Sequence, residues 1–134
     1  MKSDILVPTV TDVIIAVVPR PEAAAEELWD VYIINQRGEP MDNILITSQG
    51  YGSVDGQDMA TTTLRHFHQN LATGEALKIE PIQTALFGLN NEYWISFNNG
   101  EVMLDKKFIF KAGTISEDQL VEVPVIKQRG IMVR

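Results

Sequence analysis

His66 and His68 are the two histidines of the chain, and they lie two residues apart. Residues i and i+2 of a β-strand point to the same face, so their imidazoles would be neighbours at about 7 Å. Imidazole is a common zinc ligand, and a third ligand would have to come from Glu75, Glu80 or Asp58. The pair therefore predicts half of a metal site in a metal-dependent protein or enzyme. The alternative is two partly exposed histidines on the polar face of a strand.

No other group of residues has the spacing of a catalytic motif. Ser53 follows two glycines, but a nucleophile elbow needs Gly-x-Ser-x-Gly between a strand and a helix. The acidic loop at Asp55 and Asp58 lacks the alternating oxygen ligands and the bidentate glutamate of a calcium loop. We therefore expect no catalytic residue and no cofactor, which makes an enzyme the less favoured interpretation.

Composition excludes several classes of protein. The chain contains no cysteine, which rules out disulfides, a thiol nucleophile and metal sites built on thiolates. Its net charge of −7 opposes binding to phosphate backbones, so we expect no nucleic acid as a partner. The basic residues near the C-terminus, Lys127, Arg129 and Arg134, have no aromatic residues between them and are interpreted as a solvated end.

Length and hydropathy predict a single domain over residues 1–134 that does not bind a membrane. The apolar run at residues 13–18 is shorter than the apolar region of a signal peptide, and far shorter than the roughly 20 residues of a membrane span. If Met1 is the native start, we expect a cytoplasmic protein.

Period-two alternation is the main structural signal. Over residues 28–35, Trp29, Val31 and Ile33 share one face, which is typical of a strand with one buried side. A turn at residues 36–42 and a second apolar run at residues 43–48 complete a predicted strand-turn-strand pair.

Other segments add strands of different character. The unbroken apolar run in residues 11–18 predicts a strand that is covered on both sides or enters the core at a sheet edge. The sequence Asn-Gly within residues 98–101 predicts a hairpin. Pro124 predicts that residues 120–126 form an edge strand or contain a bulge. Residues 22–27 favour a short helical turn.

Seven or eight short strands without a long helix indicate an all-β fold, an antiparallel sandwich of two sheets. Tryptophan buries a large area wherever it packs, so Trp29 and Trp94 are expected in the core, one from each sheet. Residues 49–60 form the longest polar stretch and are predicted to be a surface loop, in which Tyr51 would be the most exposed aromatic residue.

Two segments resemble the immunoglobulin-like and fibronectin-like sandwich modules of bacterial proteins. Residues 29–35 followed by 43–47 are similar to the hairpin in which a chain ending in Asn turns and resumes. Residues 70–79 are similar to the segment of leucine, a small residue, glycine and an acid that introduces a middle strand. The resemblance implies an immunoglobulin-like fold with a binding role, and it transfers no catalytic residue.

Together these observations predict a non-catalytic binding or assembly module. The expected ligand-binding residues are Tyr51, Asp55 and Arg65. The expected partner is another protein or a second copy, joined through an exposed strand edge, either residues 11–18 or the strand with Pro124. A structural subunit of the phage type remains a further alternative, and it would form oligomers that grow with concentration.

Overall fold

The computed structural model describes residues 9–21 and 27–134, and its regular structure is almost entirely β. The helical turn predicted at residues 22–27 lies, except for its last residue, outside the described residues. Two short 3-10 helices cover Thr84–Gly88 and Glu117–Gln119. The strands are β1 (Val13–Pro19), β2 (Leu28–Asn35), β3 (Met41–Val54), β4 (Gln57–Ala60), β5 (Leu64–Leu71), β6 (Ala76–Gln83), β7 (Asn90–Asn99), β8 (Val102–Phe110), β9 (Val121–Val123) and β10 (Gln128–Val133).

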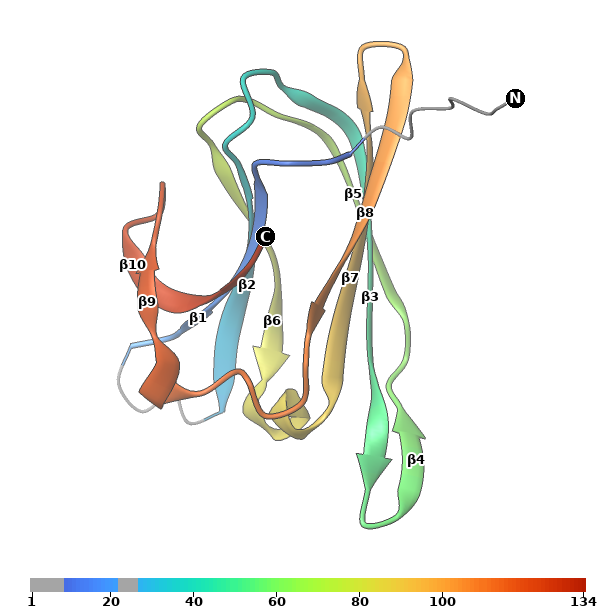
Figure 1. The fold of residues 1–134 in the computed structure, drawn as a ribbon, viewed down its shortest axis with the longest axis vertical. Coiled ribbons are helices and arrows are strands. Elements are labelled where there is room, and N and C mark those ends of the chain that lie inside the picture. Colours follow the sequence, from blue (N-terminus) through green and yellow to red (C-terminus); the bar gives the residue numbers. More distant parts are fainter. Residues whose placement is uncertain (1–8, 22–26) are drawn as a thin grey trace, which may run out of the picture.

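The strands form two antiparallel sheets, which confirms the predicted two-sheet, all-β architecture (Figure 1). One sheet, sheet A, has the order β6-β2-β1-β10-β9. The other, sheet B, has β7 and β8 on one side of β3, while β5 and β4 pair in succession along its opposite edge. This divided edge and the short β9 bring the number of strands to ten, where the sequence predicted seven or eight.

β1 is buried on both faces, as its unbroken apolar run predicted. Val13, Ile15 and Val17 belong to the main core, whereas Ile14 and Ala16 form a second cluster with buried Ile34 and Val123. The alternative that residues 11–18 form a sheet edge is wrong, because β1 lies between β2 and β10. The pairing with β10 was not visible in the sequence, because it joins segments more than a hundred residues apart.

The predicted strand-turn-strand pair at β2 and β3 is wrong, because the two strands belong to different sheets. The chain crosses between them in a turn fixed by the buried side chain of Asn35. Its amide donates to the carbonyl oxygens of Glu39 and Leu71, and its oxygen accepts from the backbone N–H of Arg37. The alternation of β2 is confirmed, since Trp29 and its odd-numbered neighbours lie in the main core.

The Asn-Gly hairpin is confirmed, with Asn99 paired to Val102 around Gly100, whose φ is +61°. The prediction that Trp94 lies in the core is wrong, because its side chain is 45% exposed. The core-facing residues of β7 are its neighbours Tyr93, Ile95 and Phe97.

Two loop predictions also change. Residues 49–60 are the end of β3 and the whole of β4, a hairpin that projects beyond the two sheets (Figure 1). β9 is an edge of sheet A, but it ends at Val123, so Pro124 follows the strand instead of lying inside it. Within the described ranges, no helix is long and apolar enough to cross a membrane.

Candidate functional site

The carboxylate of Glu80 joins the two sheets. Glu80 lies on β6 of sheet A, and only 10% of its side chain is exposed. Its oxygens accept hydrogen bonds from sheet B, from Ser48 Oγ at 2.9 and 3.2 Å and from Tyr93 Oη at 3.4 Å. His66 Nε2 lies 2.7 Å from the same carboxylate. These four side chains, Ser48, His66, Glu80 and Tyr93, are called the Glu80 cluster below.

The Glu80 cluster contains the residue types of a hydrolase triad in the wrong order. A serine nucleophile needs a histidine base in hydrogen-bond contact, with the carboxylate on the far side of the imidazole. Here the carboxylate lies between the two, and the Ser48 hydroxyl donates to Glu80 instead of His66. The geometry therefore ties β6 of sheet A to β3, β5 and β7 of sheet B and does not activate Ser48.

Tyr93 stays protonated in this setting. Burial raises the pKa of Tyr93 well above 10.0, and the negative charge of Glu80 and the hydrogen bond to it raise that pKa further. A neutral phenol can keep donating to the carboxylate over the whole physiological range. Sequence reasoning missed Ser48 and Tyr93 as site residues. The available signal was alternation, since Ser48 shares its face of β3 with buried Ile46 and Tyr93 shares its face of β7 with buried Ile95.

A pocket of about 320 Å³ opens beside the cluster. Ser48, Glu80 and Tyr93 line it together with other polar side chains such as Asn91, and side chains such as Leu28 and Ile82 contribute an apolar wall. The hydroxyls of Ser48 and Tyr93 already donate to Glu80, so these two donors are satisfied within the protein.

The structure brings one of the three proposed acids, Glu80, to the histidines, and it turns His66 and His68 to the same side of β5, where both are half-buried. Across residues 9–21 and 27–134, however, no three His, Cys, Asp or Glu side chains are gathered closely enough to hold a metal ion. Glu75 and Asp58 are exposed, and the Glu75 carboxylate accepts from the backbone N–H of Ala72. The metal site at His66 and His68 stays a prediction.

His68, although half-buried as a residue, has one buried ring nitrogen. Its Nε2 is enclosed and has no hydrogen-bond partner among the described residues. Burial and, second, the nearby His66 lower the pKa of His68 below the usual 6.5. Because protons then bind more tightly to the unfolded chain, this group lowers stability as the pH falls from about 6.5 through the lowered pKa.

We therefore expect His68→Leu to reduce the acid sensitivity of the fold. Urea unfolding of the wild type between pH 7.5 and 5 should show a loss of stability that is smaller in His68→Leu, which has no proton to take up there. Equal pH dependence in the two proteins would contradict this origin of the effect.

The structure does not gather the predicted ligand-binding residues into one site. Tyr51 is half-buried at the far end of β3, and Asp55 is exposed at the tip of the β3–β4 hairpin with φ of +52°. Arg65 is exposed on β5, opposite Thr47. The most exposed aromatic residue in the described part of the chain is Phe67 at 59%, not Tyr51 as predicted.

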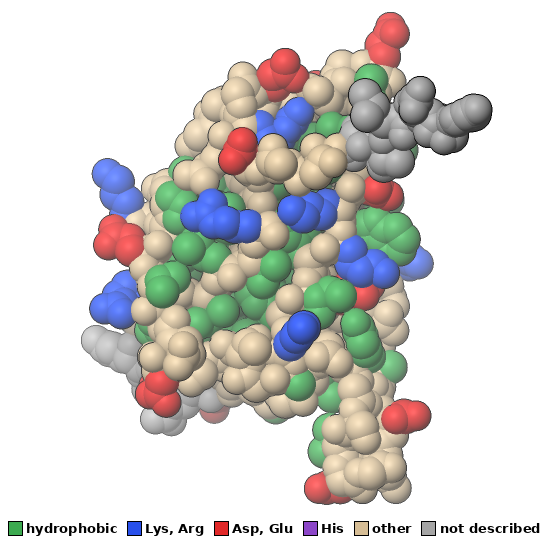
Figure 2. Space-filling model, viewed as in Figure 1, with side chains coloured by type: hydrophobic (Ala, Val, Ile, Leu, Met, Phe, Trp, Pro, Cys, Tyr) green, Lys and Arg blue, Asp and Glu red, His purple; other side chains and the backbone are tan. Residues whose placement is uncertain are grey.

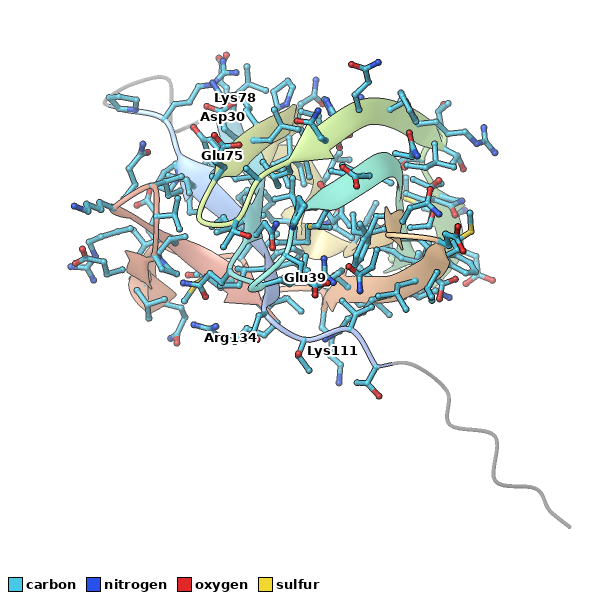
Figure 3. The ribbon with its side chains drawn as sticks, turned by 90° about the horizontal axis from the view of Figure 1, so that it is seen from above. Asp30, Glu39, Glu75, Lys78, Lys111 and Arg134 are labelled. Atoms are coloured by element: carbon cyan, nitrogen blue, oxygen red, sulfur yellow. The ribbon has the colours of Figure 1, made fainter. Side chains whose placement is uncertain are left out.

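A second charged group lies on the outer face of sheet A, where Figure 3 shows Asp30 beside Lys78. Arg20 donates to the Asp30 carboxylate through Nε and Nη2, the shortest contact being 2.8 Å. Burial works against the charge of Asp30, but the hydrogen bond from Arg20 and the charge of Lys78 prevail and lower the pKa of Asp30. The charges of Asp30, Arg20 and Lys78 are paired with one another, so we assign no ligand site to this group.

The edges of the sheets differ in how well they are protected. β6 contains Pro81, β9 has three residues and is followed by Pro124, and the β5–β4 edge is interrupted at residues 61–63. β8 has nine residues without proline, and no described strand pairs with its outer side. It borders sheet B on the side opposite β5 (Figure 1), where hydrophobic side chains are visible between the sheets (Figure 2). A long, unpaired strand edge is a template for another chain.

Comparison of the chain with protein-family models, with curated protein sequences and with solved structures finds no match.

Proposed function

We propose that the protein is a non-catalytic assembly module that self-associates by strand addition at β8. The observation that carries the proposal is the outer edge of β8, with which no described strand pairs; it is nine residues long and lacks the proline or interruption found at the other described edges. Backbone groups at such an edge can form a complete ladder with a partner strand. The Glu80 cluster supports a non-catalytic role, since its carboxylate separates Ser48 from His66.

The order of the strands supports an immunoglobulin-like sandwich. In that fold the first, second and fifth strands share one sheet, and the third, sixth and seventh share the other. If β4 is counted as an addition and β5 as an extra strand beside β3, then β1, β2 and β6 correspond to the first group, and β3, β7 and β8 to the second. β9 and β10 extend the first sheet beyond this pattern. In this correspondence β8 is the last strand of its sheet, at an edge.

The hairpin fixes which backbone groups of β8 are free. Asn99 and Val102 close a two-residue loop, so they form a hydrogen-bonded pair. In an antiparallel ladder, hydrogen-bonded and non-hydrogen-bonded residue pairs alternate. Because Val102 is in a hydrogen-bonded pair, the even-numbered residues of β8 bond to β7, and the odd-numbered ones direct their N–H and C=O groups outward. The outward set is Met103, Asp105, Lys107 and Ile109.

Lys107→Pro is the sharpest test of this proposal. Proline removes an N–H that points away from β7, which an edge strand tolerates, but the same N–H is needed by a partner strand. Light scattering over a range of concentrations should show association of the wild type and its loss in Lys107→Pro. The control Lys107→Thr loses the same charge, keeps the N–H, and should still associate.

Circular dichroism should show that both variants retain the β-sheet spectrum. A wild type that stays monomeric at every concentration, or a Lys107→Pro variant that associates as well as Lys107→Thr, would overturn assembly at β8.

A further inference from the structure

The geometry points to a closed two-fold dimer in which β8 pairs antiparallel with β8 of a second copy, centred on Lys106. This inference rests on the proposed function and adds its partner, register and stoichiometry. β8 runs from Val102 to Phe110, so Lys106 is its midpoint, and pairing about this residue overlaps all nine positions. Every outward-directed residue then faces another outward-directed residue, as an antiparallel ladder requires.

The side chains at this register are complementary. On the outer face of sheet B, Asp105 would lie opposite Lys107 of the second copy, and Lys107 opposite its Asp105. Met103 would lie opposite Ile109, and both are exposed in the single chain. Opposite charges and paired apolar side chains are the cross-strand pairs that stabilise antiparallel sheets.

Neighbouring registers lose this complementarity. A two-fold axis at Asp105 sets two aspartates against each other, and an axis at Lys107 sets two lysines against each other. Like charges directly opposite destabilise a ladder, and both shifts also shorten the overlap. Among registers with the axis within one residue of the strand's midpoint, charge therefore selects Lys106.

The axis itself brings the two Lys106 residues together, and each has contacts within its own chain that hold its ammonium. Lys106 Nζ donates to the carbonyl oxygen of Val10 at 3.3 Å and lies 5.2 Å from the centre of the Phe108 ring. The like charges are thus each held by groups of their own chain, and they lie on the opposite face of the strand from the Asp105–Lys107 pairs.

Contacts within the single chain already place the complementary charges beside the edge. Trp94 Nε1 donates to Asp105 Oδ2 at 3.3 Å, and Lys107 Nζ lies 4.7 Å from the Trp94 ring centre and 3.8 Å from a Glu92 oxygen. Such exposed contacts contribute little to folding stability. Substitutions at Asp105 and Lys107 should therefore change association more than folding.

The pairing uses the β8 edge of both copies, so it leaves no second β8 for a third chain. A contact in which the same patch is used twice closes at two subunits. The other edges of the described chain are short, interrupted or contain proline. The expected assembly is a dimer, in contrast to a structural subunit of the phage type that would keep growing.

Charge reversal tests the register. Asp105→Lys and Lys107→Asp each replace two attractive pairs with repulsive ones, and each should raise the dimer dissociation constant about tenfold. The double variant Asp105→Lys/Lys107→Asp restores opposite charges at both pairs and should return the constant close to that of the wild type. Light scattering or analytical ultracentrifugation provides the constants.

A cysteine crosslink gives an independent readout, because the chain has no cysteine of its own. Lys106→Cys places two thiols across the axis in a non-hydrogen-bonded pair, with Cα atoms at about 4.5 Å, and should form a disulfide-linked dimer on mild oxidation. The control Leu104→Cys lies on the same face, but its two copies would be about 13 Å apart, too far to crosslink.

The outcomes separate the two proposals. Weakening by both single reversals, rescue by the double variant and crosslinking at residue 106 alone support the register. If Lys107→Pro blocks association while charge reversal has no effect and Lys106→Cys does not crosslink, the register is wrong and assembly at β8 stands. Oligomers that grow beyond two overturn the closed dimer, and a monomeric wild type overturns both proposals.

Discussion

Gly130→Ala is expected to destabilise the protein by about 3 kcal/mol, at the upper end for added volume in a packed core. A Cβ atom at this position in β10 would lie 2.6 Å from the carbonyl oxygen of Val17 and 2.9 Å from Cγ2 of Val18. The nearest obstacle is backbone of β1, which cannot rotate away as a side chain would. β10 would have to separate from β1, and Val123, 3.3 Å from the same point, would shift with it.

Urea unfolding monitored by circular dichroism measures this loss. Gly38→Ala is the matched control, because nothing lies within 4 Å of a Cβ there and its φ is not in the left-handed region. The control should unfold within about 0.5 kcal/mol of the wild type. If both variants unfold at the same urea concentration, β10 does not pack as closely on β1 as the structure indicates.

Glu80→Leu is expected to destabilise the fold by roughly 2–3 kcal/mol. Leucine is of similar size but leaves the Ser48 and Tyr93 hydroxyls without their acceptor, and an unsatisfied buried donor costs about 1–3 kcal/mol. His66 is partly exposed, so its Nε2 can turn to water and adds less to the loss.

A double-mutant cycle separates this mechanism from a simple change of packing. Ser48→Ala removes the orphaned hydroxyl, so it should cost less in the Glu80→Leu background than in the wild type. Glu80→Gln, which retains an acceptor oxygen, should lose less stability than Glu80→Leu. Additive effects of Ser48→Ala and Glu80→Leu would show that the hydroxyl and the carboxylate are not coupled.

Local patterns in the sequence predicted the strands better than their partners. Alternation in β2 and the unbroken apolar run of β1 identified which faces are buried, because both signals depend only on neighbouring residues. The crossing at Asn35 was read as a hairpin, because a short polar connection fits either topology. At this crossing the Asn35 amide donates to the Leu71 carbonyl, 36 residues away, a contact that has no signal in the neighbouring residues.

Trp94 was wrongly predicted to be buried because the large size of its side chain was given more weight than the alternation of the strand around it. It shares its face of β7 with Glu92 and Ser96, whereas Tyr93 and Ile95 lie on the buried face. The pattern around it therefore indicated an outward position, and the preference of tryptophan for the core did not decide it.

The candidate site was only half visible for a related reason. The spacing of two residues predicted that His66 and His68 share one face of a strand, and Glu80 was among the acids considered as a third ligand. Ser48 and Tyr93 come from two other strands, and only the arrangement of the sheets brings them to the same carboxylate. Of the two predicted edges, the one at residues 11–18 is wrong because β1 acquires its second neighbour, β10, from the far end of the chain, whereas β9, next to Pro124, does lie at an edge of sheet A.

That same pairing has a consequence for the order of events during translation. Val17 meets Ile131 in the ladder, so sheet A cannot be completed until nearly all of the described chain has left the ribosome. Before then, Ile14, Ala16 and Ile34 lack the cover that Val123 and Met132 later provide. The nascent protein therefore exposes these apolar side chains until β10 has paired with β1. During that time chaperone binding or aggregation would compete with folding.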